Sequence, residues 1–413
     1  MSEQAHQEVG KRRVFYIPGY DPVHPRRYRE LYRKEGDAQA RISGYDIALK
    51  GRQGAARYGW NIRAHIEGQD VEADMEVLVW SDIVKDSMEL SIPATYWMLV
   101  RTAWTYIASG TLCRLMWLRK GPVVAALYPI GILILQFLLA VALGWAVGAL
   151  AGWGARRLAG TGAGFMAFGL VSAGVFILLL RWFRKIDNKI LAYYLMHDYA
   201  YSASTNGANP PELEARMREF GAVIAAALTS DVDEVLVVGH SSGAHLGVSI
   251  LADLVRAGQV PEDGPALAFL TLGQVVPMVS FLPAAGRLRG DLHYLSQRRE
   301  LTWLDVTAPG DGCAFALCDP VAVSGVAPDT GQIWPLVISA AFTQTLSPAR
   351  WKELRWKFFR LHFQYMSAFD RPGDYDYFRI TAGPQTLAGR FAGRAPSKSR
   401  IDLSASKYTS MTP

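Results

Sequence analysis

The chain contains little cysteine for its length, with only Cys113, Cys313 and Cys318 among 413 residues. Three cysteines make neither a disulfide framework nor a four-ligand zinc site. No HExxH motif offers a metal-binding helix, and the other histidines are scattered. The polar and then basic start, Met1 to Arg13, has no apolar stretch of a signal peptide behind it. We therefore expect reduced thiols that face the cytoplasm, no metal and no cofactor.

Charged residues are also sparse, at 19% of the chain, with 43 basic and 37 acidic side chains. The net charge of +6 could indicate a nucleic-acid partner, but no concentrated basic and aromatic patch accompanies it. Many Arg and Lys residues instead stand beside apolar segments. An anionic membrane surface is therefore the expected neighbour, and no nucleic acid is expected.

Two long apolar runs interrupt the chain. Residues 123–151 carry no charge, and a second run, 162–181, is uncharged until Arg181. The first run exceeds the roughly 20 residues that cross a bilayer as a helix. Together with the short link at 152–161, the two runs predict a transmembrane hairpin of two helices. This hairpin is the main part of an insertion over residues 92–200.

Basic residues flank the predicted hairpin more heavily than its link. The outer flanks carry Arg101, Arg114, Arg119, Lys120, Arg181, Arg184, Lys185 and Lys189, whereas the link carries Arg156 and Arg157. The positive-inside rule then predicts a multi-pass membrane protein whose soluble domain and both termini are cytoplasmic.

Two features of the insertion indicate what it packs against. Gly144, Gly148 and Gly152 follow each other at four-residue spacing, which lets another helix approach closely. We expect the second span as the partner, with homodimerisation as the alternative, and the oligomeric state stays open. Residues 93–118 are rich in Trp, Tyr and Met. They fit either a lid that lies on the membrane surface or a cap on the soluble domain.

Short apolar stretches alternate with helical patterns on both sides of the insertion. Strands are expected at 14–17, 58–64, 75–80, 235–238, 267–272 and 301–307, and helices at 26–34, 212–228, 286–299 and 350–366. This alternation indicates an α/β fold with a mostly parallel sheet flanked by helices. Residues 1–91 and 201–390 would form it together, and the Ser-, Lys- and Arg-rich stretch 391–413 is expected to be a disordered tail.

The motif Gly239-His-Ser-Ser-Gly243 stands between an apolar run, Val235 to Val238, and a helical pattern. A strand, a tight G-x-S-x-G turn and a helix lift a serine hydroxyl, here Ser241, to the top of a sheet. The two glycines let the strand and helix backbones pass close together. Residues 238–247 resemble the nucleophile elbow of the α/β-hydrolase superfamily, which includes esterases, lipases and thioesterases. The resemblance covers the soluble parts of the chain and identifies no subfamily.

The resemblance implies a catalytic serine, then an acid, then a histidine along the chain. Ser241 is followed by Asp311, in a Gly-rich turn after a predicted strand, and by His362, the only histidine after that acid. Asp305, inside the strand pattern, and Asp319, before Pro320, are the rival acids.

The resemblance also implies two backbone N–H donors for an oxyanion, from Ser242 and from an early loop. Pro18-Gly19-Tyr20 resembles that loop and would supply the N–H of Tyr20, although many relatives have His-Gly at this place. His240 and His245 flank the serine, and we expect packing or hydrogen-bonding roles for both.

These features predict a membrane-anchored serine hydrolase, similar to esterases and lipases, that forms an acyl-enzyme on Ser241. Its expected substrate is an acyl ester or a lipid-like small molecule, and thioesters and amides remain open. A catalytically silent α/β-hydrolase-like scaffold of a membrane complex is the second hypothesis, because a fold does not fix a function. A transporter is disfavoured, because the spans lack an internal charge.

Overall fold

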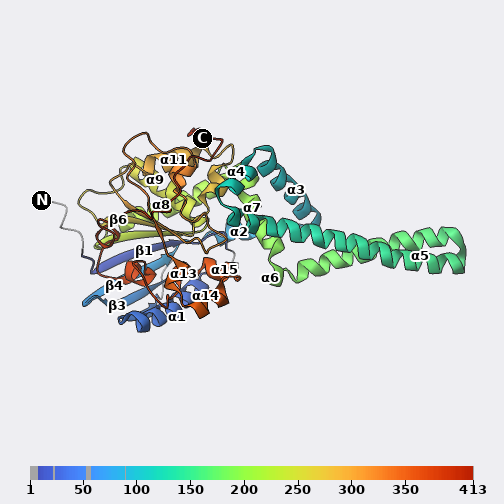
Figure 1. Ribbon diagram of the computed structural model, residues 1–413, viewed down its shortest axis with the longest axis horizontal. Helices are drawn as coiled ribbons and strands as arrows, with labels where there is room; N and C mark the ends of the chain where they lie inside the picture. The colour runs from blue at the N-terminus through green and yellow to red at the C-terminus, as the bar shows by residue number, and fades with distance from the viewer. Residues whose placement is uncertain (1–7, 22–23, 53–56, 89, 413) are drawn as a thin grey trace. The chain divides into compact units, whose positions relative to one another are not determined.

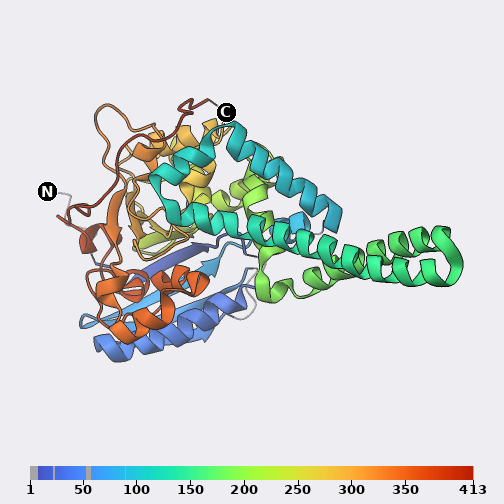
Figure 2. The same ribbon diagram turned by 45° about the vertical axis from the view of Figure 1, so that its right-hand side comes forward.

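A computed structural model describes residues 8–21, 24–52, 57–88 and 90–412 of the chain. The chain divides into two compact units (Figures 1 and 2). The first unit contains residues 1–86, 108–122 and 205–413, and the second contains 87–107 and 123–204. The second unit covers most of the predicted insertion at 92–200 and extends a few residues beyond each of its ends. Residues 108–122, which lie inside the predicted insertion, belong to the first unit.

The first unit is organised around an eight-stranded sheet with the order β2-β3-β4-β1-β5-β6-β7-β8. Its strands are β1 (Lys11–Ile17), β2 (Asp46–Gly51), β3 (Gly59–Ile66), β4 (Gln69–Val77), β5 (Glu234–His240), β6 (Ala266–Leu272), β7 (Thr302–Thr307) and β8 (Leu336–Ser339). The strand β3 pairs antiparallel with both β2 and β4. All the other neighbouring pairs, from β4-β1 to β7-β8, are parallel. The mostly parallel α/β sheet that the sequence predicted is confirmed.

Helices cover both faces of this sheet (Figure 1). The first unit contains α1 (Arg26–Ser43), α4 (Thr111–Leu118), α8 (Pro211–Ala227), α9 (Gly243–Arg256), α10 (Val276–Ser280), α11 (Gly286–Leu295), α12 (Pro320–Val323), α13 (Phe342–Thr345), α14 (Pro348–Leu354), α15 (Phe358–His362), η1 (Gln364–Met366), α16 (Tyr377–Ala382) and α17 (Leu387–Arg390). The helix α2 (Ser81–Met88) crosses the boundary between the units. Every residue of β5 is buried as a result, which explains its continuous apolar run.

The predicted helix at 350–366 is wrong as a single element. The structure divides it into α14, α15 and η1, because the chain leaves the helical conformation at Lys357, with φ −99° and ψ 66°. A continuous helix needs a repeating buried stripe. Residues 355–360 are all exposed instead, and burial resumes only at Leu361.

The predicted disorder of the C-terminal stretch is also wrong for the described residues 391–412. The amide of Ser397 donates to the carbonyl of Val337, and the amide of Asp319 donates to the carbonyl of Ile401, both at 2.9 Å. Ala405 is buried as well. Backbone groups carry this order, and a side-chain composition rich in Ser, Lys and Arg does not reveal them.

The second unit contains α3 (Ile92–Ala108), α6 (Asp187–Ile190), α7 (Ala192–Ala203) and nearly all of α5 (Lys120–Lys185). The 66-residue α5 leaves the helical conformation at Gly160, where φ is 87° and ψ is 178°. The predicted pair of spans is therefore described as one helix with two arms, and α5 is the one helix in the described chain that is long and apolar enough to cross a membrane. Membrane crossing itself stays a prediction.

The glycine stripe of the first arm lies against the second arm. A Cβ added at Gly144 would come 2.9 Å from the carbonyl oxygen of Ser172. A Cβ at Gly152 would come equally close to the carbonyl oxygen of Gly164. The partner number falls as the glycine number rises, so the two arms run antiparallel (Figure 2). Small residues permit this close approach.

The short helix α4 explains why residues 108–122 belong to the first unit. Thr111 Oγ1 donates to the carbonyl of Phe281 at 2.9 Å, and Arg114 donates to the carbonyl of Ala405 at 3.0 Å. Arg119 Nε donates to the carbonyl of Ala316 at 2.9 Å. Of the two readings for residues 93–118, a cap on the soluble domain thus fits α4.

Candidate active site

Ser241 occupies a strained turn between β5 and α9. Its φ is 55°, in the left-handed region that a residue with a Cβ seldom adopts. Its amide donates to the carbonyl of Leu272 at 2.9 Å, which ties the turn to the end of β6. The residues before and after it are buried, whereas Ser241 itself is half-buried. The turn thus presents the serine hydroxyl at the carboxyl ends of the parallel strands.

The two glycines of the motif are required by close backbone contacts. A Cβ at Gly243 would overlap the carbonyl oxygen of Ile17 and lie 2.7 Å from that of Pro18, both at the end of β1. A Cβ at Gly239 would lie 2.8 Å from the Cα of Ala244. The structure thus contains the close passage of strand and helix that the sequence predicted.

The loop after β1 lies directly beside the serine. A Cβ at Gly19 would come 3.0 Å from the Cβ of Ser241 and 3.5 Å from its Oγ. Trp80 holds this loop, because its Nε1 donates to the carbonyl of Pro18 at 2.9 Å. Tyr20 is buried, with its ring 5.9 Å from that of Trp80 in an edge-on contact. The predicted donor loop is therefore next to the predicted nucleophile.

Ser242 stands at the N-cap position of α9. Its amide donates to no acceptor in the part of the chain that the structure describes. An N–H at a helix N-terminus carries part of the positive end of the helix dipole. This amide is therefore suited to stabilise a negative charge beside Ser241.

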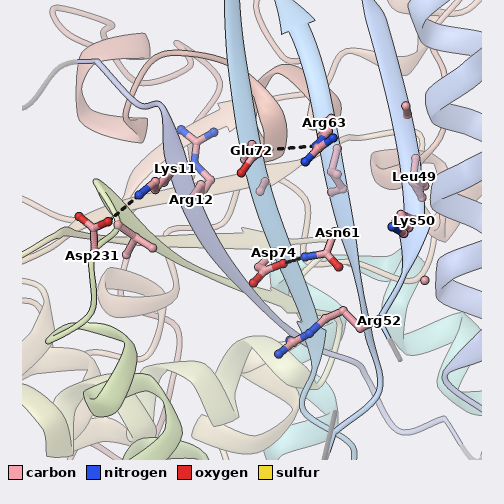
Figure 3. A pocket seen from close by; sticks show the side chains of 15 residues that line it. Lys11, Arg12, Leu49, Lys50, Arg52, Asn61, Arg63, Glu72, Asp74 and Asp231 are labelled. Atoms are coloured by element: carbon pink, nitrogen blue, oxygen red, sulfur yellow. Dashed lines mark hydrogen bonds and ion pairs between the residues drawn. The ribbon is translucent and has the colours of Figure 1, made fainter. Parts of the chain in front are cut away.

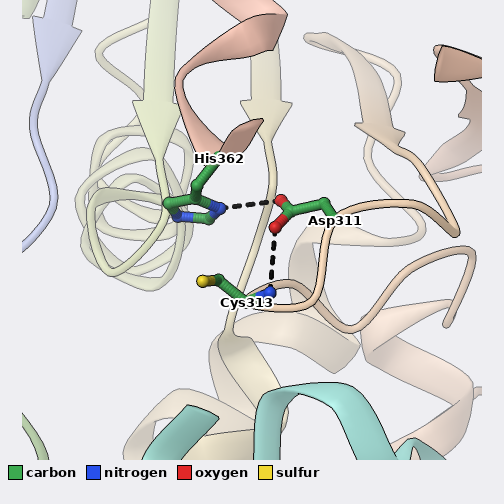
Figure 4. A group of neighbouring side chains, drawn as sticks. All are labelled: Asp311, Cys313 and His362. Carbon is green, nitrogen blue, oxygen red and sulfur yellow. Dashed lines mark hydrogen bonds and ion pairs between the residues drawn. The ribbon is translucent and has the colours of Figure 1, made fainter. Parts of the chain in front are cut away.

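Asp311 and His362 form a buried hydrogen-bonded pair (Figure 4). The Nδ1 of His362 lies 2.7 Å from Oδ2 of Asp311. The other carboxylate oxygen accepts the amide of Cys313 at 2.9 Å. Asp311 also accepts the hydroxyl of Tyr365 at 3.0 Å, and that hydroxyl accepts the amide of Ala308 at 3.0 Å. The acid is thus fixed in the turn after β7 from several directions.

These contacts decide the charge of the acid. Burial alone would raise the pKa of Asp311, but the neighbouring His362 and the donors from Cys313 and Tyr365 outweigh burial and lower it. Burial, followed by the charge of Asp311, raises the pKa of Tyr365 well above its ordinary value. The tyrosine therefore stays a hydrogen-bond donor, and the aspartate stays ionised.

Two neighbours bring His362 to the same sheet end as Ser241. Nε2 of His240 lies 3.0 Å from the carbonyl oxygen of His362, and the two rings are 4.7 Å apart. A Cβ at Gly273, the residue after β6, would lie 3.0 Å from Cε1 of His362. Among the described residues, Oγ of Ser241 forms no hydrogen bond, to His362 or to any other group. Such bonds commonly tighten only when a substrate is present.

The two rival acids have other partners. Asp305 accepts the hydroxyl of Thr271 at 2.6 Å, and burial raises its pKa to about 8. Asp319 caps α12 by accepting the amides of Val321 and Ala322 at 3.0 and 3.2 Å. Neither is hydrogen-bonded to His362 in the described structure, so Asp311 is the acid that the geometry favours.

Burial keeps the two histidines that flank Ser241, His240 and His245, neutral. Burial, and then the nearby His362, lowers the pKa of His240 to about 3, and burial lowers that of His245 to about 4. His240 therefore supports the backbone of His362 as a neutral ring. This agrees with the hydrogen-bonding role expected for it.

Sequence reasoning missed Tyr365 and Gly273. Gly273 adopts a φ of 54°, and a Cβ there would also lie 2.7 Å from the ring of Tyr365. Neither residue belongs to a recognisable motif. Their role arises only when the ends of β6 and β7 meet the segment after α15, so no sequence signal marks them.

Asp311, Cys313 and His362 each offer one potential ligand atom, and these atoms lie within 4.8 Å of one another (Figure 4). A carboxylate, a thiol and an imidazole are a donor set that can hold Zn²⁺. In this structure, however, Asp311 and His362 are hydrogen-bonded to each other. Asp311 and His362 could therefore hold a metal together with Cys313 or serve the predicted triad together with Ser241, but not both at once.

A hollow of about 1150 Å³ lies elsewhere in the first unit, beside β1 to β4 (Figure 3). Charged side chains line it, and four of them form two ion pairs with each other. Lys11 pairs with Asp231 at 2.5 Å, and Arg63 pairs with Glu72 at 3.0 Å. The side chains of both pairs are exposed to solvent, where ion pairs contribute little, so we assign no site to this hollow.

Comparisons with protein-family models, with curated proteins and with solved structures find no match to this chain.

Replacing Gly243 by Ala should destabilise the first unit by about 3 kcal/mol, because the new methyl group overlaps the end of β1. Gly221→Ala is the control. Gly221 lies within α8, and a Cβ there would lie an ordinary 3.9 Å from Ile250. This substitution should therefore stabilise the first unit by up to about 1 kcal/mol. Chemical unfolding of both purified variants measures these changes in the free energy of unfolding. Equal unfolding midpoints would contradict the close contact.

Replacing Tyr365 by Phe should lower the free energy of unfolding by about 1–3 kcal/mol, because Asp311 and the amide of Ala308 each lose a buried partner. The matched control is Tyr16→Phe. The hydroxyl of Tyr16 is buried without a partner in the described structure, so its removal should cost nothing. Similar losses in the two variants would argue against the role given to Tyr365.

Asp305→Asn should become more stabilising relative to the parent as pH rises. The unfolded chain releases this proton above about pH 4, whereas the folded chain keeps it until its pKa of about 8. Unfolding thus releases a proton in this window, and parental stability falls as pH rises through it. The difference in melting temperature should therefore be larger at pH 8 than at pH 5. A difference independent of pH would mean that Asp305 is ionised in the fold.

Proposed function

We propose that the first unit is a serine hydrolase that cleaves an acyl ester. The observation that carries the proposal is the strained Ser241, placed at the sheet end where Asp311 and His362 form a buried pair. Strain at a non-glycine residue is retained where a turn needs it, and such positions cluster at active sites. The strand–turn–helix arrangement and the order Ser, Asp, His support a resemblance to α/β-hydrolases.

In this mechanism Oγ of Ser241 attacks the carbonyl carbon of the ester. Its proton passes to Nε2 of His362, because Nδ1 of the same ring already donates to Asp311. The amides of Ser242 and Tyr20 would hold the oxyanion, each donor contributing about 3 kcal/mol in the transition state. His362 then gives its proton to the leaving alcohol.

Water cleaves the resulting acyl-enzyme by the same steps. It loses a proton to His362, and the serine recovers that proton as the acid product leaves. Asp311 stays ionised throughout. Burial raises its pKa, but the contacts from His362, Cys313 and Tyr365 outweigh burial and lower the pKa.

The exposed apolar surface of α5 supports a membrane location. Leu150, Phe165 and Leu170 are 71%, 73% and 75% exposed. Water-facing apolar surface of this extent is rare in soluble proteins, whereas lipid tails would cover it. The two arms would cross the bilayer, and their basic flanks favour a cytoplasmic first unit. A lipid-like ester fits this location best.

A catalytically silent scaffold is the second candidate. The observation that favours it is the absence of a hydrogen bond from Oγ of Ser241 in the described structure. A scaffold would keep the strained turn for packing alone and would not react with an electrophile.

A fluorophosphonate probe distinguishes the two, because it reacts only with an activated serine. Membranes that contain the protein should label, Ser241→Ala should abolish labelling, and Ser230→Ala, at an exposed turn, should not change it. Asp311→Asn should slow labelling by about 10³–10⁴-fold, whereas Asp305→Asn should have little effect. Folded protein that does not label at Ser241 would favour the scaffold.

A further inference from the structure

The segment Arg355-Trp-Lys-Phe-Phe-Arg360 runs from the end of α14 into the first residues of α15 and is exposed along its whole length. Its three aromatic side chains, Trp356, Phe358 and Phe359, are 71%, 47% and 40% exposed. Single exposed apolar residues are common on protein surfaces, but a run of large aromatic ones marks a binding surface. Only a partner with an apolar surface can remove these three side chains from water.

Basic side chains alternate with these aromatic rings. Lys357 and Arg360 both pair with one acid, Glu353, at 2.9 and 3.4 Å. The guanidinium of Arg355 lies over the ring of Trp356 at 5.5 Å, and Arg355 forms no ion pair with an acid among the described residues. The segment therefore keeps a net positive charge. Trp and Phe mixed with Arg and Lys are typical of segments that lie at the boundary of an anionic bilayer.

The segment is continuous with the point where α5 begins. A Cβ at Gly312 would lie 3.2 Å from the ring of Phe358, and a Cβ at Gly121 would lie 3.2 Å from the carbonyl oxygen of Gly312. Gly121 is the second residue of α5 and belongs to the first unit. The start of the apolar helix, the turn that carries Asp311 and the aromatic segment therefore meet in one place.

We infer that residues 355–360 lie on an anionic lipid surface, with the three aromatic side chains in the headgroup boundary and the three basic side chains against lipid phosphates. His362 follows this segment after one residue. The base of the candidate site is thus carried by a membrane-contacting element. That this contact brings a lipid-like ester to Ser241 rests on the function proposed above.

The full chain, reconstituted in vesicles, tests the inference. Phe359→Cys would carry an environment-sensitive fluorophore in a background with Cys113→Ser and Cys313→Ser, while the buried Cys318 remains. In vesicles containing phosphatidylglycerol, the emission should shift to the blue and be quenched several-fold by lipids with a spin label near the headgroup. A fluorophore at Leu403→Cys, also exposed in the first unit, is the control and should be quenched much less.

The charge and aromatic contributions are tested in the same assay. Neutral vesicles, or the pair Trp356→Ser and Arg360→Gln, should lower quenching at position 359 by about threefold or more. Ile42→Ser, at another exposed apolar residue, should not. Equal quenching at positions 359 and 403 would overturn the inference. A shift produced by an oligonucleotide and not by anionic vesicles would overturn it in favour of a nucleic-acid surface.

Repeating the quenching with Ser241→Ala separates this inference from the proposed hydrolase. Quenching that persists in a variant without hydrolysis supports the lipid contact independently of catalysis. If the parent protein hydrolyses esters but shows no quenching at position 359, the lipid contact is wrong and the enzyme proposal stands.

Discussion

The close approach of α9 to the end of β1 is the constraint on which the candidate site depends. Without a side chain at Gly243, the helix begins against the carbonyls of Ile17 and Pro18. The chain can then turn from β5 into α9 only through a residue with positive φ, and that residue is Ser241. The same contact brings Gly19 against the serine. One backbone packing requirement thus sets the strain of the turn, the exposure of the hydroxyl and the position of the neighbouring loop.

Two aspartates on and just after β7 show how the surroundings determine the state of a carboxyl group. Asp305 has one hydroxyl donor, from Thr271, and burial raises its pKa to about 8. Asp311 is equally buried, but His362, an amide and a tyrosine hydroxyl outweigh burial and lower its pKa. Only the second can remain charged beside an imidazole at neutral pH. This contrast is a physical reason to choose Asp311, and not Asp305, as the acid between Ser241 and His362.

The sequence predicted the features that depend on local pattern. Apolar runs predicted β1, β3, β5, β6 and β7, whereas the strand predicted at 75–80 overlaps only the end of β4. The glycines around Ser241 predicted the turn. It could not reveal Tyr365, whose hydroxyl joins Ala308 to Asp311 only after folding. The order of the C-terminal stretch was missed for a similar reason, since its hydrogen bonds come from backbone groups such as that of Ile401.

The break within residues 350–366 was the most consequential error of the sequence interpretation. Read as one helix, the segment would bury an aromatic stripe and leave its charges outside, and no concentrated basic and aromatic patch would be apparent. The non-helical conformation at Lys357 turns these side chains to the surface instead. Burial returns at Leu361 and His362, so the same short segment supplies an exposed aromatic face and a buried histidine. A partner that binds the exposed aromatic face therefore contacts the same short segment that carries His362 of the candidate site.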